Sequence, residues 1–181
     1  MSEELEVLKE VTARLRDAGI AYMLTGSFAG NYYAVPRMTR DIDLVVELTA
    51  QDAERVIELF QQDYYLDREI VLRAVQDESM FNMIHRTLVV KVDCVVRKDS
   101  EYRRTEFSRR RAVSIEGQPV YIVAPEDLIL SKLEWARASQ SQRQLDDVRN
   151  LLGSVPELDY AYLDHWAHRL GLAALLREVR S

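Results

Sequence analysis

Two short stretches decide the fold of this chain: LTGS at residues 24–27 and DIDL at residues 41–44, separated by thirteen residues. The first ends an apolar run that starts at Ile20 and is typical of a short buried strand, and a short helix is predicted after it over residues 28–34. The second begins a strand predicted over residues 41–46, because its apolar side chains alternate with other residues. The sequence therefore predicts a strand–turn–helix unit followed by a strand that carries two acids.

The two acids are suited to holding a divalent cation. Asp41 and Asp43 are two residues apart, so on a strand both carboxylates point to the same side, while Ile42 and Leu44 anchor the strand in the core. Two carboxylates held together repel each other and lose hydration. A divalent cation offsets this cost, and Mg²⁺ prefers one or two carboxylates together with substrate phosphates. We therefore expect Mg²⁺ at this pair, with Mn²⁺ as an alternative ion, although an Asp-x-Asp pair alone is common on strands.

A third acid lies on a later predicted strand, residues 88–97. Asp93 and Lys91 share one face of that strand, and the opposite face is apolar. A charged residue in such a strand is costly unless it has a partner. If this strand lies beside residues 41–46, three carboxylates converge and suit two metal ions, which activate an attacking oxygen and stabilise a leaving pyrophosphate. The alternative is that Asp93 is a rim residue paired with Lys91 or Arg97.

The Gly26-Ser27 corner offers a site for phosphates. Glycine lets the backbone approach a ligand closely. The helix that begins there presents free N–H groups and the positive end of its dipole, and Ser27 adds a hydroxyl donor. Arg37 precedes the acidic strand and is a second candidate, because guanidinium groups match phosphate geometry; its alternative is an ion pair with the carboxylates.

The rest of the chain divides into two regions. Before residue 124 the pattern predicts a helix up to Ala18, further helices over 51–62 and 69–75, and strands over 80–85, 88–97, 111–115 and 120–123, with a two-residue turn at Arg86-Thr87. After it, only helices are predicted: 126–138, 143–152, 160–170 and 172–179. We expect an α/β (α+β) fold with a small mixed sheet flanked by helices over residues 1–123, and a helical region over 124–181 packed on it.

Composition excludes several classes of protein. The chain has 181 residues, 48% of them hydrophobic and 30% charged, which is typical of one globular core. Its longest apolar runs span five residues, too short for a membrane helix, so we expect no membrane partner. The acidic start resembles no signal peptide and predicts a cytoplasmic protein. The single cysteine, Cys94, excludes an intramolecular disulfide and a cysteine-cluster zinc site.

The charge distribution has one basic exception in an acidic chain. The net charge is −6, which disfavours non-specific binding to a polyanion. Residues 97–111, however, contain seven basic and three acidic residues. This stretch is either a solvated helix face with internal ion pairs or a patch that receives a polyanionic substrate.

The order of these motifs resembles the nucleotidyltransferase superfamily related to DNA polymerase β. Its signature is a hydrophobic residue, Gly and then Gly or Ser, followed after about nine to thirteen residues by Asp, a hydrophobic residue, an acid and a hydrophobic residue. Residues 24–27 and 41–44 match it, and Asp93 matches the third carboxylate. Residues 124–133 and 143–147 resemble small bacterial nucleotidyltransferase-like proteins that include abortive-infection toxins of toxin–antitoxin systems. Those proteins often carry a Lys-Asp pair where this chain has Arg143-Gln144.

The resemblance implies transfer of a nucleoside monophosphate from a nucleoside triphosphate to an acceptor hydroxyl on RNA, a protein or a small molecule, with release of pyrophosphate. Asp41, Asp43 and Asp93 would hold two Mg²⁺ ions, and Gly26 and Ser27 would grip the β and γ phosphates. Lys132 would face the cleft from the first helix of the second region, unless it is an exposed helix lysine.

Other interpretations concern the whole protein and three of its residues. The chain could be a catalytically silent module of the same fold that acts with a partner protein, such as a cognate antitoxin, or a structural helical adaptor. Asp147 is expected to be an exposed or structural acid, paired with Arg143 four residues before it. Trp135 and Trp166 are expected in the helical core or between helices.

Overall fold

The computed structural model describes residues 2–181, and in that part of the chain seven strands form one mixed sheet. The strands are β1 (Tyr22–Thr25), β2 (Asp41–Val46), β3 (Tyr64–Tyr65), β4 (Met80–His85), β5 (Lys91–Val96), β6 (Arg111–Ile115) and β7 (Gln118–Ile122). Their order across the sheet is β3-β4-β5-β2-β1-β7-β6. The strand β2 is antiparallel to β1 and parallel to β5, so the two acidic strands are neighbours near the middle of the sheet.

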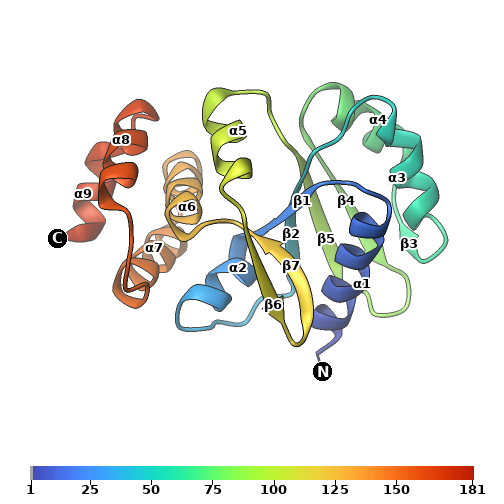
Figure 1. The fold of residues 1–181 in the computed structure, drawn as a ribbon, viewed down its shortest axis with the longest axis horizontal. Coiled ribbons are helices and arrows are strands. Elements are labelled where there is room, and N and C mark those ends of the chain that lie inside the picture. Colours follow the sequence, from blue (N-terminus) through green and yellow to red (C-terminus); the bar gives the residue numbers. More distant parts are fainter. Residues whose placement is uncertain (1) are drawn as a thin grey trace.

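Helices cover both faces of this sheet (Figure 1). They are α1 (Glu3–Asp17), α2 (Gly26–Tyr33), α3 (Asp52–Phe60), α4 (Arg68–Gln76), α5 (Glu101–Ser108), α6 (Pro125–Ser139), α7 (Gln142–Ser154), α8 (Tyr160–Arg169) and α9 (Ala173–Arg180). Figure 1 shows the C-terminal helices α6–α9 gathered at one end of the long axis, with α1, α3 and α4 toward the other. None of the helices in residues 2–181 is long and apolar enough to span a membrane.

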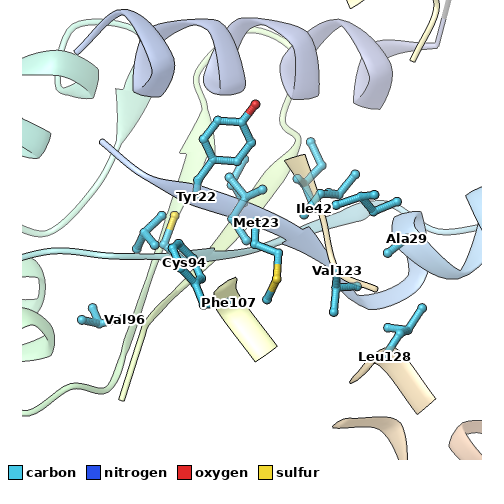
Figure 2. Packing of buried hydrophobic residues seen from close by; sticks show 14 of the residues in the cluster. Tyr22, Met23, Ala29, Ile42, Cys94, Val96, Phe107, Val123 and Leu128 are labelled. Atoms are coloured by element: carbon cyan, nitrogen blue, oxygen red, sulfur yellow. The ribbon is translucent and has the colours of Figure 1, made fainter. Parts of the chain in front are cut away.

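Alternation along the central strands separates an apolar face from a polar one. Ile42, Leu44 and Cys94 point into the core and are at most 2% exposed. In Figure 2, Tyr22 on β1 points toward α1, and the next residue, Met23, points to the other side of the sheet. The residues between the buried ones on β2 and β5 therefore face the side on which α2 and α6 lie, and these residues include the acids.

The helix α6 joins the C-terminal helices to the sheet. It begins with Pro125 in its first turn, where a proline costs no hydrogen bond. Its buried face includes Leu128, Ile129 and Leu133, each at most 1% exposed, and it packs against α2 and α8. Asp127 in its first turn is fully buried and accepts three hydrogen bonds. The donors are Tyr102 on α5, Arg109 directly after α5, and Tyr162 on α8.

These features confirm an α/β fold with a mixed sheet flanked by helices, and only helices after β7. The basic stretch, residues 97–111, contains α5. Its arginines bond acids inside the stretch, for example Arg104 with Asp99, as one of the two alternatives expected, and also acids outside it, for example Arg109 with Asp127. Two details differ from the sequence-based expectation. The short strand β3 was not predicted. The predicted two-residue turn at Arg86-Thr87 is wrong, because the connection to β5 runs on to Val90 and places Val89 at a φ of 54°.

Candidate active site

The register of β2 and β5 brings two of the predicted acids directly opposite each other. Asp43 pairs with Asp93 across the parallel ladder, and Asp41 pairs with Lys91 two residues earlier. On the other side of β2, Thr25 lies opposite Asp43. Asp43 and Asp93 therefore face the same side of the sheet at the point where β1 ends and α2 begins.

The backbone at that point approaches Asp43 more closely than any residue with a side chain would allow. Gly26 has a φ of +64°, and a Cβ atom added there would lie 2.0 Å from Oδ2 of Asp43 and 2.5 Å from its Cγ. The backbone N–H of Ser27 donates a hydrogen bond to the Asp43 carboxylate. The glycine-serine corner and the acids thus form one site.

The surroundings of Asp43 disfavour the ionised form of its carboxylate. Burial, and next the negative charge of Asp93, raise the pKa of Asp43 to about 6, against weaker opposing effects from the Ser27 N–H and Lys132. Oδ1 of Asp93 is buried and has no hydrogen-bond partner. A buried carboxylate oxygen without a partner is unfavourable, so this pair of acids lacks a cation or donor.

Lys91 supplies part of the missing positive charge. Its Nζ lies 2.8 Å from Oδ2 of Asp93 and 3.4 Å from Oδ2 of Asp41. The hydrogen bond to Asp93 raises the pKa of Lys91, although burial opposes the shift. Of the two partners considered for Asp93, the structure selects Lys91, because Arg97 bonds Glu47 instead.

The three acids fit a hard divalent cation by their chemistry. Within residues 2–181, as the side chains stand, no three His, Cys, Asp or Glu side chains form a group that could hold a metal ion. Asp41 is the outlying member, since its side chain is 54% exposed and turned to Lys91. The oxygen-only donors, the unpartnered Oδ1 of Asp93 and the mutual repulsion of Asp43 and Asp93 are nevertheless the features that Mg²⁺ or Mn²⁺ would satisfy.

The predicted phosphate ligands meet at the first turn of α2. Arg37 donates from Nη2 to Oγ of Ser27 at 2.7 Å, and both its Nε and Nη2 donate to the Asp147 carboxylate at 2.9 Å. Lys132 donates to Oδ2 of Asp147 at 2.7 Å and is 4% exposed, so it is not an exposed helix lysine. Ser27, Arg37 and Lys132 therefore lie together beside Gly26.

Asp147 has other ion-pair partners than the sequence predicted. It was expected to pair with Arg143 on its own helix, and this is wrong, because its partners are Arg37 and Lys132. Although burial acts in the opposite direction, the hydrogen bonds from these two cations hold the pKa of Asp147 below its usual value. Asp147 thus ties α7 to α6 and to the segment that leads into β2.

A cleft of about 270 Å³ opens over the acids. Its walls include Gly26, Ser27, Asp43, Asp93 and Lys132, and also Trp135. The core position expected for Trp135 is wrong: this side chain is 61% exposed, whereas Trp166 is 6% exposed, as expected. A second groove of about 400 Å³ adjoins the cleft, and the two share Thr25, Val95, Ser131 and Trp135.

Sequence reasoning named Lys91 only as one of two alternative partners of Asp93, and it missed the roles of Asp147 and Trp135. The signal for Lys91 was present, because it shares a strand face with Asp93 two residues away. No local signal pointed Asp147 to Arg37, which is 110 residues distant in the chain.

The chain matches no protein-family model and no curated protein sequence. Solved structures do resemble it. ANT(2")-Ia in complex with adenylyl-2"-tobramycin superposes with a TM-score of 0.62 and 15% identity, over 99% of this chain and 100% of that one. This chain has a nucleotidyltransferase fold.

Two further structures share the nucleotidyltransferase fold. A nucleotidyltransferase-like antigenic protein from Paracoccidioides brasiliensis gives a TM-score of 0.57 and 19% identity, over 83% of this chain and 75% of that one. The lincosamide antibiotic adenylyltransferase LnuA, bound to lincomycin, gives 0.56 and 14%, over 83% and 96%. The expected nucleotidyltransferase fold is therefore confirmed.

Proposed function

We propose that this protein is a divalent-metal-dependent nucleotidyltransferase. It moves a nucleoside monophosphate from a nucleoside triphosphate to an acceptor hydroxyl and releases pyrophosphate. The observation that carries the proposal is the contact between Gly26 and Asp43, with Asp93 opposite, because it joins a phosphate-binding corner to paired carboxylates in one cleft. Nucleotidyl transfer needs the phosphate-binding corner and the carboxylates to lie no farther apart than the length of a triphosphate.

The residues of the corner bind the triphosphate. The N–H groups at the start of α2 and the Ser27 hydroxyl face the phosphates, and Arg37 and Lys132 neutralise their charge. Asp147 holds both cations in place before the nucleotide arrives. Preformed positive groups of this kind stabilise the charge that develops as the phosphoryl bond breaks.

The acids hold the metal and orient the acceptor. Asp41, Asp43 and Asp93 are the residues that would hold Mg²⁺ or Mn²⁺, up to two ions, and the metal supplies charge neutralisation at the phosphates. Asp93 also accepts the hydrogen bond of the acceptor hydroxyl. A carboxylate in this position aligns the hydroxyl for attack and receives its proton.

The acceptor enters through the second groove. This groove shares Trp135 with the cleft, and its lining includes valines as well as the charged residues Arg97, Lys98, Arg103, Arg137, Glu106 and Glu134. A partly cationic groove with an exposed tryptophan suits RNA, a protein hydroxyl or an antibiotic hydroxyl. The neighbours bound to adenylyl-2"-tobramycin and lincomycin support the last of these.

Incubation of the protein with each radiolabelled nucleoside triphosphate, a cell extract and Mg²⁺ tests this function. We expect a labelled acceptor that is absent with EDTA and absent for Asp43→Asn. The identity of the labelled species names the acceptor. Absence of label with all four triphosphates, in protein shown to be folded, would contradict the proposal.

A second function is favoured by the ion pairs already present in the site. Lys91, Arg37 and Lys132 are each bonded to an aspartate, so the three cations of the site already have partners without a nucleotide. This arrangement is compatible with a silent module that acts with a partner protein, as in toxin–antitoxin systems. Thermal unfolding with Mg²⁺ and each triphosphate separates the two, because a ligand at 100 times its Kd adds about 2.7 kcal/mol of stability. No shift with any nucleotide favours the silent module.

A further inference from the structure

We propose that Lys91 is a built-in competitor of the divalent cation, which occupies the acidic cluster as its counter-ion and must leave for the metal to bind. Lys91 thereby weakens metal binding and sets the metal affinity of the free protein. This inference rests on the proposed metal site.

The sheet itself forces Lys91 into the cluster. It lies directly across the parallel ladder from Asp41, and it precedes Asp93 by two residues, on the same strand face. Its Nζ reaches both carboxylates, at 2.8 Å from Asp93 and 3.4 Å from Asp41. No other cation forms an ion pair with either of these two acids in the described part of the chain.

The ammonium group uses oxygens that a metal ion also needs. Oδ2 of Asp93 and Oδ2 of Asp41 both face Nζ. Magnesium ligands lie at about 2.0–2.1 Å from the ion, so a metal bound to the same oxygens would lie within a few ångströms of the ammonium group. Two cations at that separation repel strongly, because both are partly removed from water.

The lysine is free to move away. Its side chain is 38% exposed, and it ends in a flexible four-carbon stem rather than in a fixed guanidinium fork. Asp93 is only 13% exposed and retains one buried oxygen with no partner, so one ammonium group does not satisfy it. A divalent ion with several coordination positions satisfies the acids more fully than Lys91 does.

Binding of Mn²⁺ alone, followed by the loss of its free-ion EPR signal, tests the inference without measuring activity. We compare the wild type with Lys91→Met, Lys91→Gln and Lys91→Arg. Lys98→Met is the matched control, because Lys98 is an exposed lysine near the cleft that makes no ion pair with the acids. It corrects for the general gain in cation affinity when any positive charge is lost.

We expect Lys91→Met and Lys91→Gln to bind Mn²⁺ at least about tenfold more tightly than Lys98→Met, which corresponds to about 1.4 kcal/mol. Lys91→Arg keeps the charge and should bind no more tightly than the wild type. Lys91→Gln retains a hydrogen-bond donor for Asp93, so it tests the inference even if Lys91→Met fails to fold.

Two results overturn the inference, and they differ in what they say about the proposed function. If the wild type binds Mn²⁺, Asp43→Asn does not, and the uncharged Lys91 variants bind no more tightly than Lys98→Met, then Lys91 is no competitor but the metal site stands. If neither the wild type nor any variant binds Mn²⁺, the metal site fails, and the inference fails with it.

Discussion

At the scale of single residues, Gly26 has the least room for a Cβ atom among the glycines that the structure describes. Its positive φ and its contact with Asp43 are two separate constraints. Gly117 provides a matched comparison, because its φ is +82° and a Cβ there would meet nothing within 4 Å. A substitution at Gly117 therefore measures backbone strain alone, whereas one at Gly26 adds a steric clash to that strain.

We expect Gly117→Ala to cost only the strain of a positive φ, ~1–3 kcal/mol, with nucleotidyl transfer retained. Gly26→Ala should cost more, because its Cβ would lie 2.0 Å from Oδ2 of Asp43, and transfer should be lost as that carboxylate moves. Urea denaturation and the transfer assay measure both effects. If both variants lost the same stability and Gly26→Ala retained nucleotidyl transfer, the close approach of Gly26 to Asp43 would not be needed for the site.

The raised pKa of Asp43 predicts a pH dependence of stability in the metal-free protein. The folded state binds this proton more tightly than the unfolded chain, because the pKa of Asp43 is raised from its ordinary value of 3.8 to about 6. As pH rises from about 4 to about 6, Asp43 therefore makes a growing unfavourable contribution to stability. That contribution is absent from Asp43→Asn.

We expect the Tm of Asp43→Asn, relative to the wild type, to rise between pH 4 and pH 6 in EDTA and to level off above that range. Calorimetry at several pH values measures this difference and cancels the other titrating groups. A constant difference would show that Asp43 is solvated and is not opposed by Asp93.

At the scale of elements, Asp147 joins α7 to α6 and to the segment before β2. Asp146 next to it is the natural control, since its side chain is 63% exposed and its partners, Gln142 and Arg149, lie on the same helix. Asp147→Asn leaves buried Lys132 without its carboxylate, and it should destabilise the fold by about 2 kcal/mol.

We expect Asp146→Asn to change stability by less than about 0.5 kcal/mol. Asp147→Asn should also raise the KM for the nucleotide more than it lowers kcat, because the cations it positions bind phosphate groups. Denaturation and steady-state kinetics measure these effects. An unchanged KM would show that Arg37 and Lys132 are held elsewhere or do not contact the nucleotide.

How far the sequence predicts each element depends on the range of its contacts. Alternation placed Asp41 and Asp43 on one face of β2 and Asp93 on the polar face of β5, because a strand's periodicity is local. The turn before β5 was mispredicted because Val89 adopts a positive φ, which is rare for a β-branched residue. Asp147 was mispaired because helical spacing suggests only neighbours, whereas its partners come from other elements.

At the scale of the whole molecule, one apolar cluster includes residues from the sheet and from the C-terminal helices. Residues such as Leu24 and Ile42 belong to the same cluster as Leu128 and Leu163. The boundary predicted near residue 124 therefore does not divide the buried cluster into two, and Lys132 completes the cleft from beyond that boundary.

We expect one cooperative unfolding transition, and we expect residues 1–123 alone not to fold. Both tryptophans lie after residue 124, so their fluorescence reports on the C-terminal helices, while far-UV circular dichroism reports on the whole chain. Coincident denaturation curves from the two probes are the expected result. Two separate midpoints, or a folded fragment of residues 1–123, would instead establish two independent domains.

Because Cys94 is buried, its reaction with a thiol reagent reports on local opening of the sheet. The only thiol of the chain is 2% exposed on β5, and desolvation raises its pKa, so a thiol reagent cannot reach it or find it ionised in the native state. Its neighbour in the chain is Asp93. Slow alkylation of the native protein therefore measures how often the middle of the sheet opens. A ligand that holds the acids together should slow this reaction by a factor that grows exponentially with the free energy of stabilisation it adds.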